Sequence, residues 1–480
     1  MEGRGYLRNT GIDTDMAAVG ARPAPDERNP NLGAGVEVVT SQSSSAGSGG
    51  VAVLTAANYA AQGTRLVFSV VIAQVFGPVG RGAVALIAVL DEASSILLTG
   101  GVPPAAGYRA KIGASSDSAL MSAALRLGLI SLPLVLPLAF AIGIFFLGAL
   151  EPPVRWITVL LIAWTGLVNL PSLTGMNLMQ AHRDLTGLAV YNVLFGSVTL
   201  AVVLVLLLAG HLTLLGVGIG IAAGRLASSL YAAARVAWPK LRGAAPLRPL
   251  LSYGIRALPG TTSMLVNNRF DQLLIAPLVD LHALGLYAVA AGTSFLPTVP
   301  ANSVASASFS AITHDSHLGR QAVASTAIRR GLLVSAVVAA GLAALAPLAV
   351  PLVYGSDFQG AVLPTILLLV GSVPWGGQIV ARQCGNALGY PGFGSVGEVA
   401  GLVVTVAGLA AAVPFLGILG AALVSLAAYV VRFGTTMLLL RRNAGVRGVV
   451  PGFDDARWLV SRSWQTARSA TGFSPGKRHS

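Results

Sequence analysis

Ionisable and amide side chains inside long apolar segments are the residues of this chain that could carry chemistry. One apolar segment is interrupted by the run NNRFDQ at positions 267–272. A charged side chain at the centre of a bilayer costs about 2.5–3.5 kcal/mol on insertion scales, so a helix that keeps one usually turns it toward a partner, a cavity or a ligand. Arg269 and Asp271 stand two positions apart. They do not face each other on a helix, so each needs a partner elsewhere.

Ten polar residues inside apolar segments form the candidate site, and we expect them to line a central cavity. In the first half of the chain they are Arg65, Asp91, Glu92 and Arg225. In the second half they are Asn268, Arg269, Asp271, Gln378, Arg382 and Glu398. The alternative is that the charged members form structural ion pairs that lock the packing of the helices.

The composition indicates an integral membrane protein. Apolar residues make up 54% of the 480 residues and charged residues only 10%, whereas a soluble domain has about 25% charged residues. The net charge of +13 comes almost entirely from arginine. These arginines gather in the loops and the tail, which is a signal of membrane topology, so no nucleic-acid partner is expected. The single cysteine, Cys384, excludes an internal disulfide.

Apolar segments long enough to cross a bilayer recur along the chain and predict an all-α fold. Six lie in the first half, near 52–76, 82–106, 120–149, 154–179, 185–209 and 213–236. Six more lie in the second half, near 250–277, 282–311, 326–354, 360–386, 392–414 and 417–440. The expected fold class is therefore a polytopic membrane protein of about twelve transmembrane helices in two six-helix bundles.

Polar segments divide the chain into five parts. We predict a disordered cytoplasmic arm at 1–50, an N-terminal bundle at 51–236, a basic cytoplasmic linker at 237–249, a C-terminal bundle at 250–440 and a basic cytoplasmic tail at 441–480. The arm is rich in Ser, Gly and Pro, which is typical of disorder. In the tail, apolar residues follow helical spacing among arginines, at Ala456, Val460, Trp464 and Ala467. This pattern predicts either a helix on the anionic leaflet or a solvated tail.

Basic residues mark one side of the membrane. The even-numbered junctions between predicted spans hold Arg109, Lys111, Arg183, Lys240, Arg242, Arg248, Arg320, Arg329 and Arg330, and the odd-numbered ones hold only Arg81 and Arg155. By the positive-inside rule, both termini are cytoplasmic. The two sets of spans also look like a repeat, because GRGAVA at 80–85 and GLYAVA at 285–290 both read G-x-x-A-V-A. Two halves of six spans in one orientation imply a pseudo-two-fold axis along the membrane normal.

Motifs that would indicate an enzyme are missing from the sequence. It contains no G-x-x-x-x-G-K-[ST] phosphate loop, no H-E-x-x-H, no G-x-S-x-G and no Cys/His cluster with metal spacing. The predicted external loops are short, whereas an integral glycosyltransferase, ligase or polymerase would need a substantial extramembrane domain. Gly and Pro are frequent inside the predicted spans, which suits helices that bend between two states. We therefore expect a transporter without a cofactor.

Four runs of residues, in order along the chain, resemble those of bacterial polysaccharide transporters, the O-antigen-type flippases. They are FGPVGRG at 76–82, RFDQLL at 269–274 with LGLYA at 284–288, YGSDF at 354–358 with ALGYP at 387–391, and VPFLGILGAA at 413–422. The resemblance covers the chain from about 52 to 440. It implies membership of the superfamily that also holds multidrug-and-toxin extruders and lipid II flippases, whose two six-helix bundles form a V and work by alternating access.

The resemblance implies a flippase that moves a lipid-linked oligosaccharide from the inner to the outer leaflet of a bacterial cytoplasmic membrane. An undecaprenyl-type tail would stay in the lipid while the pyrophosphate and the sugars cross a polar cavity. The candidates for binding the pyrophosphate are Arg65, Arg225 and Arg269, because guanidinium suits bidentate phosphate contact. The further cavity candidates are Asn268, Gln378 and Arg382. The candidates for coupling to H⁺ or Na⁺ are Asp91, Glu92, Asp271 and Glu398. The expected protein partners are a polysaccharide polymerase or glycosyltransferases.

Two other functions stay open. A cation-coupled exporter of drugs or metabolites would keep the fold and would need a cavity of carboxylates and aromatic rings. Aromatic residues make up only 6% of this chain, and arginine is prominent among the candidate residues. A non-transporting membrane scaffold for a polysaccharide synthase would tolerate the neutralisation of all the intramembrane polar residues.

Overall fold

The computed structural model of the chain describes residues 34–146, 152–240, 243–314, 319–448 and 450–458. Its contacts divide the chain into two units, Met1–Ala52 and Val53–Ser480. The described part of the first unit is helical from Ala34 onward. The predicted arm, linker and tail stay predictions.

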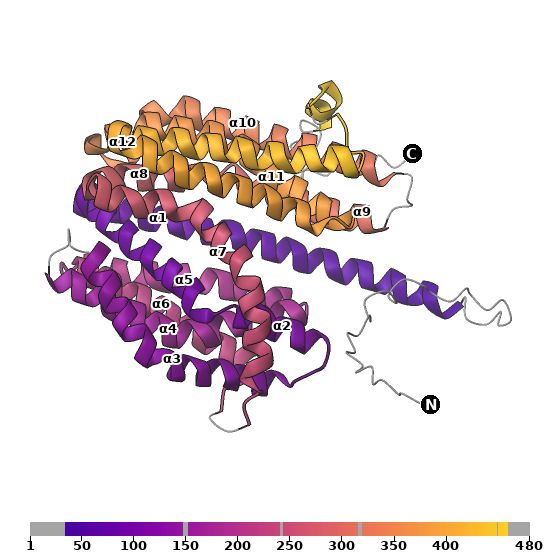
Figure 1. Cartoon of the computed structure of the whole chain (residues 1–480), viewed down its shortest axis with the longest axis horizontal. Helices are drawn as coiled ribbons and strands as arrows, with labels where there is room; N and C mark the ends of the chain where they lie inside the picture. Colours follow the sequence, from indigo (N-terminus) through magenta and orange to yellow (C-terminus); the bar gives the residue numbers. More distant parts are fainter. Residues whose placement is uncertain (1–33, 147–151, 241–242, 315–318, 449, 459–480) are drawn as a thin grey trace, which may run out of the picture. The chain divides into compact units, whose positions relative to one another are not determined.

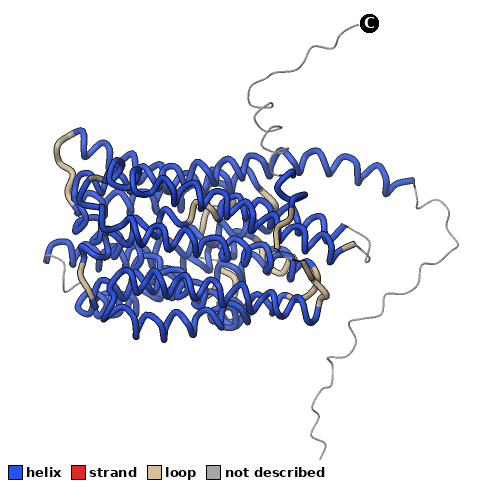
Figure 2. Tube along the Cα trace, turned by 90° about the horizontal axis from the view of Figure 1, so that it is seen from above, coloured by secondary structure: helices blue, strands red, loops and turns tan. Residues whose placement is uncertain are grey.

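The described residues form α-helices joined by short loops and contain no β-strand (Figure 2). In order, the helices are α1 (Ala34–Thr99), α2 (Val102–Lys111), α3 (Asp117–Phe146), α4 (Pro152–Ala181), α5 (Leu185–Leu208), α6 (Leu214–Arg235), α7 (Leu247–Leu278), α8 (Leu281–Ser294), α9 (Thr298–His314), α10 (Arg320–Tyr354), α11 (Val362–Ala387) and α12 (Pro391–Asn443). A 3-10 turn, η2 (Ser356–Ala361), precedes α11.

Two glycines divide long helices into pairs of spans. Gly77 in α1 and Gly417 in α12 have φ angles of 63° and 55°, a conformation that glycine adopts without strain. Therefore α1 holds the first two predicted spans, the second of which continues into α2, and α12 holds the last two. Judged by length and apolar composition, seven described helices could cross a membrane, or eight with one bent pair counted as a span. That count takes α1 and α12 as one helix each, although each of them holds two predicted spans.

Within the second unit the helices form two bundles (Figure 1). The first bundle is α2–α6, in which α3 packs on α4 and α5 packs on α6. The second bundle is α8–α12, in which α11 contacts α9, α10 and α12. Helix α7 lies between them, because it packs on α2 and α3 and also on α8 and α12. One buried core joins α1 to both bundles, with Leu86 of α1, Ile221 of α6 and Tyr287 of α8 among its members.

Glycines bring α1 and α8 into backbone contact. A Cβ atom added at Gly82 would overlap the carbonyl group of Leu281, and one added at Gly285 would overlap the carbonyl group of Pro78. The contact is therefore reciprocal, as in an interface between two elements related by a two-fold axis. In the repeated G-x-x-A-V-A motif Gly285 aligns with Gly80, but its contact is with Gly82, two residues further along α1.

Further contacts of α1 with the second bundle lie near the same kink. Gln74 Nε2 donates a hydrogen bond of 2.7 Å to the Val353 carbonyl at the end of α10. Ala73 belongs to a buried cluster with Val289 of α8 and Val350 of α10. This closely packed region, which holds the α7–α8 turn at Asp280, is called the closed end below.

The turn between α1 and α2, together with α2, contacts the N-terminal half of α7. A Cβ atom added at Gly101 would overlap the backbone of Gly254. The rings of Tyr108 in α2 and Tyr253 in α7 stack with their centroids 5.3 Å apart. These contacts place the first half of α7 with the first bundle.

The turn before α5 is fixed by Asp184. Its carboxylate accepts a hydrogen bond of 2.9 Å from the Gly187 amide and caps the helix. Arg235, at the end of α6, donates to the same carboxylate at 2.8 Å. The Arg235 guanidinium holds the pKa of the Asp184 carboxyl below its usual range. This contact ties the start of α5 to the end of α6.

Candidate functional site

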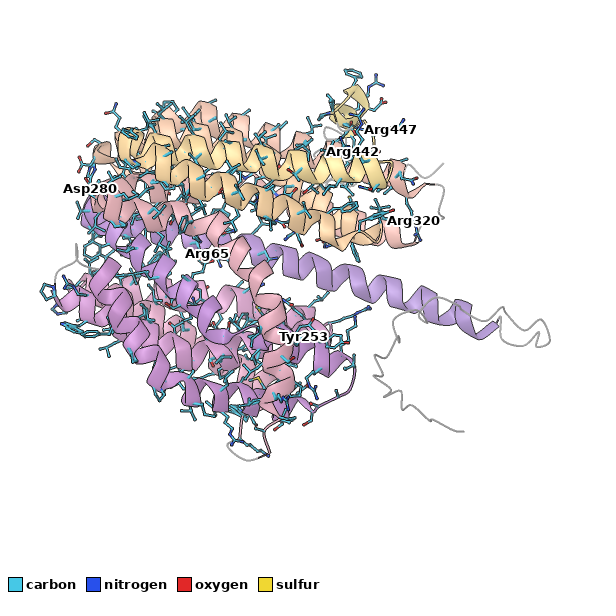
Figure 3. The ribbon with its side chains drawn as sticks, in the orientation of Figure 1. Arg65, Tyr253, Asp280, Arg320, Arg442 and Arg447 are labelled. Carbon is cyan, nitrogen blue, oxygen red and sulfur yellow. The ribbon has the colours of Figure 1, made fainter. Side chains whose placement is uncertain are left out.

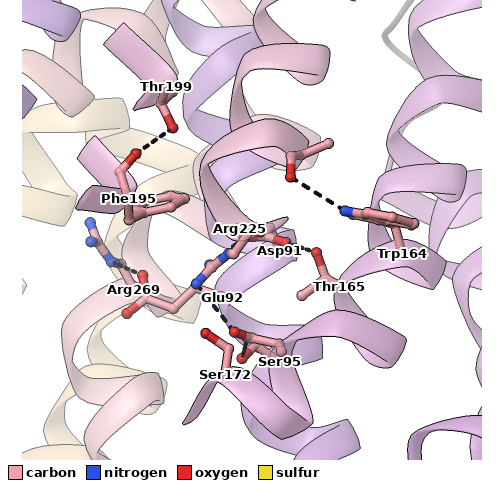
Figure 4. A network of polar contacts seen from close by, with 12 residues as sticks. Asp91, Glu92, Ser95, Trp164, Thr165, Ser172, Phe195, Thr199, Arg225 and Arg269 are labelled. Atoms are coloured by element: carbon pink, nitrogen blue, oxygen red, sulfur yellow. Dashed lines mark hydrogen bonds and ion pairs between the residues drawn. The ribbon is translucent and has the colours of Figure 1, made fainter. Parts of the chain in front are cut away.

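Asp91 and Arg225 form a buried ion pair in the first bundle (Figure 4). Arg225 Nη2 lies 2.5 Å from Asp91 Oδ2, and the two side chains are 19% and 4% exposed. The Thr165 hydroxyl of α4 donates to the other carboxylate oxygen. The Arg225 guanidinium lies over the Phe195 ring of α5, 4.6 Å from its centroid. Side chains from α1, α4, α5 and α6 therefore enclose this pair.

A row of polar side chains on α4 supports the ion pair. Asn169 donates to the hydroxyl of Ser95 on α1 and accepts a bond of 3.5 Å from Arg225 Nη1. Ser172 Oγ lies 2.9 Å from the hydroxyl of Tyr191 on α5. The row satisfies polar groups that would otherwise be unpaired in the bundle interior, and it fixes the rotamers around Arg225.

Glu92 and Arg269 form a second ion pair, which links α1 to α7 (Figure 4). Arg269 Nε lies 2.9 Å from Glu92 Oε2, and the two side chains are 30% and 44% exposed. The Arg269 guanidinium also lies 5.5 Å from the centroid of the Phe295 ring. Because Glu92 directly follows Asp91, adjacent residues of α1 hold two half-buried arginines, but Asp91 itself is buried whereas the Glu92 side chain is 44% exposed.

Arg65 of α1 is an exposed arginine, labelled in Figure 3. Arg269, Glu92 and Arg225 lie close enough to act electrostatically on its charge. Among the described residues, no hydrogen bond or ion pair joins Arg65 to another side chain. Arg65, Arg225 and Arg269 are called the arginine cluster below. Two of its three arginines pair with the carboxylates of Asp91 and Glu92, so the site keeps an excess of positive charge.

Asp271 of α7 is buried, and its side-chain hydrogen-bond partners belong to the second bundle. Its carboxylate accepts hydrogen bonds from the Tyr287 hydroxyl of α8 at 2.5 Å and from the Ser425 hydroxyl of α12 at 3.3 Å. Within the described part of the chain, no arginine or lysine forms an ion pair with it. Arg269 and Asp271 thus have separate partners on different helices, as their helical spacing requires.

Glu398 forms an ion pair with Arg432, and both residues belong to α12, on opposite sides of the Gly417 kink. Arg432 is buried, and its Nε and Nη1 have no hydrogen-bond partner in the described structure. The helices can approach closely here because Gly401 has no side chain: a Cβ atom there would overlap the Arg432 side chain. The sequence analysis missed Arg432, although it is an arginine inside a predicted span and the same signal would have found it.

The remaining candidates do not join the arginine cluster. Gln378 is buried in α11, and neither atom of its amide has a hydrogen-bond partner in the described structure. Arg382, one turn further along α11, lies against Gly394 of α12. The side chain of Asn268 lies outside the described residues. Within the described residues, no three His, Cys, Asp or Glu side chains stand close enough to hold a metal ion.

The chain is similar to known proteins in its sequence profile and in its fold. A family profile described as "Polysaccharide biosynthesis protein" matches residues 71–363. Among curated proteins, none matches the chain by sequence.

Several solved structures share the fold. The lipid II flippase MurJ, in an inward closed conformation, has a TM-score of 0.69 and 14% identity, over 88% of this chain and 93% of the MurJ chain. An inward-facing multidrug resistance MATE transporter of the MOP superfamily has a TM-score of 0.63 and 16% identity, over 82% and 94%. The eukaryotic MATE transporter AtDTX14 has a TM-score of 0.60 and 14% identity, over 87% and 98%. These similarities confirm the predicted fold class, an all-α multi-pass membrane protein with two bundles.

Proposed function

Because the chain belongs to the polysaccharide biosynthesis protein family, as its sequence resemblance predicts, we propose that it is a flippase for a lipid-linked oligosaccharide. It moves this ligand from the inner to the outer leaflet by alternating access. The observation that carries the proposal is the arginine cluster, in which three arginines accompany only two carboxylates. Support for transport as the general activity comes from the similar solved structures, whose titles name a flippase and multidrug transporters.

The arginine cluster suits a pyrophosphate group. Guanidinium binds two phosphate oxygens at once, and a charged hydrogen bond is stronger in a site of low dielectric constant than in water. Arg65 is exposed and has no described partner, so it makes the first contact. Arg269 follows by exchanging Glu92 for phosphate, because a partly exposed ion pair contributes little stability. Arg225 stays with Asp91 and supplies a fixed positive charge behind them.

The closed end gives the ligand a direction of entry. By the positive-inside rule, the turn at Asp280 faces the outside of the cell and the loops at Arg109 and Arg320 face the cytoplasm. Contacts of α1 with α8 and α10 then close the outer side. This conformation supports access to Arg65 from the inner leaflet, where lipid-linked oligosaccharides are assembled.

Arg65→Ala is expected to stop glycan export while the chain still inserts and folds. The substitution removes the charge that makes first contact with the pyrophosphate, so lipid-linked oligosaccharide should accumulate on the inner leaflet. Arg65→Lys should restore only part of the activity, because ammonium cannot bind phosphate in the bidentate geometry. The measurement is the leaflet distribution of the lipid-linked oligosaccharide in cells that carry the variant as their only copy.

A matched control is Arg126→Ala, which removes an arginine from α3 of the same bundle but outside the cluster. It should leave export unchanged. If the double variant Arg65→Ala, Arg269→Ala exported glycan at the wild-type rate, the arginine cluster would be rejected as the ligand site.

Asp271 is the proposed coupling carboxylate, binding H⁺ or Na⁺. Asp91, Glu92 and Glu398 each have an arginine partner, whereas the described donors to Asp271 are two hydroxyl groups and the Gln272 amide. Asp271→Asn keeps the shape and the hydrogen-bonding groups but cannot bind a cation or release a proton.

Asp271→Asn is therefore expected to abolish export driven by an H⁺ or Na⁺ gradient and to retain ligand binding. Proteoliposomes with an imposed gradient of either ion measure the driven export. Ser425→Ala, which removes one neutral hydrogen bond from the same carboxylate, is the control and should keep most activity. Gradient-driven export by Asp271→Asn at the wild-type rate would place coupling elsewhere.

An exporter of cationic drugs or metabolites is the second candidate, and the structural similarity to MATE transporters supports it. Such a cargo would need an excess of carboxylates, whereas the cluster around Arg65 has an excess of arginine. Lost drug efflux with intact glycan export in Arg65→Ala would favour this exporter. A non-transporting scaffold would instead show no change in either assay.

A further inference from the structure

We propose that residues 444–448 and 450–458, here called the anchor segment, bind the anionic phospholipid surface of the membrane where α10 begins and α12 ends. This binding is independent of the flippase function. Three observations support the proposal. They are the attachment of the segment to α10, its level relative to the membrane, and its exposed side chains.

The anchor segment is attached to α10 through a buried carboxylate. Asp455 Oδ2 lies 2.9 Å from Arg329 Nε and 3.0 Å from the amide of Gly452, and Asp455 is buried. Arg329 Nη1 also donates to the Gly448 carbonyl at 2.8 Å. Arg329 of α10 therefore holds the segment at two points, and Arg330 Nε lies 3.9 Å from the second Asp455 oxygen.

Apolar and cation–π contacts complete the attachment. Val446 and Ala444 are buried in a core that includes Ile328 of α10. The guanidinium of Arg330 lies 4.4 Å from the centroid of the Trp458 ring. The segment is thus ordered before it meets a partner, so binding does not require the loss of much conformational freedom.

The attachment point marks the level of the membrane boundary. From Gly331 to Tyr354, α10 carries no charged residue. A helix of that length rises about 36 Å at 1.5 Å per residue, enough to cross a hydrocarbon layer about 30 Å thick. Arg329 and Arg330 therefore stand where α10 enters the headgroup region. Because Arg329 holds Asp455 and Gly448, the anchor segment lies at the same level.

The exposed side chains of the anchor segment suit a lipid surface. Val450 and Phe453 are 81% and 73% exposed, although both are apolar. The guanidinium of Arg457 lies 4.8 Å from the centroid of the Phe453 ring, and Arg447 is exposed nearby in the sequence. Apolar side chains flanked by arginines bind anionic membrane surfaces by insertion and by charge attraction together.

The last turn of α12 adds two more arginines at this boundary, Arg441 and Arg442, and both are exposed. The sequence pattern predicted that the apolar side of a membrane-surface helix in the tail consists of Ala456, Val460, Trp464 and Ala467. Ala456 is instead half-buried, the other three lie outside the described residues, and Val450 and Phe453 take this role.

Spin labelling of the full chain tests the proposal. In a Cys384→Ala background, a nitroxide is attached at Phe453→Cys, and the chain is placed in nanodiscs of phosphatidylcholine with or without phosphatidylglycerol. With phosphatidylglycerol present, we expect collisions of the label with oxygen, which partitions into lipid, to exceed those with a water-soluble nickel complex several-fold. A label at the neighbouring, exposed Asp454→Cys is the matched control and should show the opposite preference.

Charge and attachment are tested separately. Arg447→Gln with Arg457→Gln should return the label at 453 toward water, and high salt should do the same to the unsubstituted segment. Asp455→Asn should leave the bundles folded but increase the mobility of the label, because the attachment to Arg329 weakens.

Two results would overturn the proposal. One is a label at 453 that meets the nickel complex as often as the label at 454 in anionic nanodiscs. The other is a label that stays in water in nanodiscs and becomes shielded only in native membranes, which would assign the surface to a protein partner.

Discussion

The variant Asp91→Ala is expected to unfold at a clearly lower temperature than the unsubstituted chain. It removes the carboxylate from a buried pair and leaves the guanidinium of Arg225, only 19% exposed, without its counter-charge. Breaking a buried ion pair by removing one partner costs about 3–5 kcal/mol. Thermal unfolding of the purified chain in detergent, followed by tryptophan fluorescence, measures the loss.

The next residue of α1 provides a matched control. Glu92 is 44% exposed and pairs with Arg269, and an exposed ion pair contributes about 0–1 kcal/mol. Glu92→Ala should therefore change the unfolding temperature little, although it removes the same charge one position away. The double variant Asp91→Ala, Arg225→Met should recover much of the lost stability, because it leaves no unpaired charge. Equal losses for Asp91→Ala and Glu92→Ala would contradict the burial that separates the two pairs.

The helices of this chain could be predicted from the sequence because their signal is local. A bilayer requires about 20 consecutive apolar residues for each span, and the segments between polar junctions supply them. Even the division of α12 at Gly417 was visible, since two predicted spans meet there. The polar stretch before Val51 carries no span signal, so composition is the only basis for a prediction there.

The partners of the candidate residues could not be predicted in the same way. Helical spacing shows that the side chains of Arg269 and Asp271 cannot contact each other. It does not show which neighbouring helix packs against each side chain. Glu92 reaches Arg269 from 177 positions away in the sequence. The side chains that hold Asp91 and Asp271, such as Thr165 and Tyr287, are hydroxyl groups that occur throughout membrane helices and give no separate signal.

The closed end was only partly visible in the sequence. The G-x-x-A-V-A repeat marks both segments that meet there, but the register of the contact depends on how α1 and α8 cross. Gly82 and Gly285 are the residues at the crossing, and the sequence motif aligns Gly285 with Gly80 instead. Backbone contact between two helices requires small residues on both, and composition does not show which of many glycines face each other.

Gly82→Val is expected to prevent closure of this end and so to stop export. The added Cβ would overlap the Leu281 carbonyl, which is a backbone group and cannot turn aside as a side chain would. Overpacking of a close contact costs about 1–3 kcal/mol. Since 1.4 kcal/mol is a factor of ten in an equilibrium constant, the equilibrium constant for closure should fall by about 5-fold to 100-fold. A transporter that cannot close one side cannot complete alternating access.

Thiol cross-linking measures the closure directly. In a Cys384→Ala background, Gln74→Cys and Val353→Cys place two thiols across the closed end, where the native residues are hydrogen-bonded. Gly82→Val should reduce the yield of a short bis-thiol cross-link, and glycan export should fall with it. Gly63→Ala, on the same helix with open space around its Cβ position, is the control and should keep both, because alanine favours a helix over glycine. A full cross-link yield together with normal export in Gly82→Val would show that the α1–α8 contact is not required for the transport cycle.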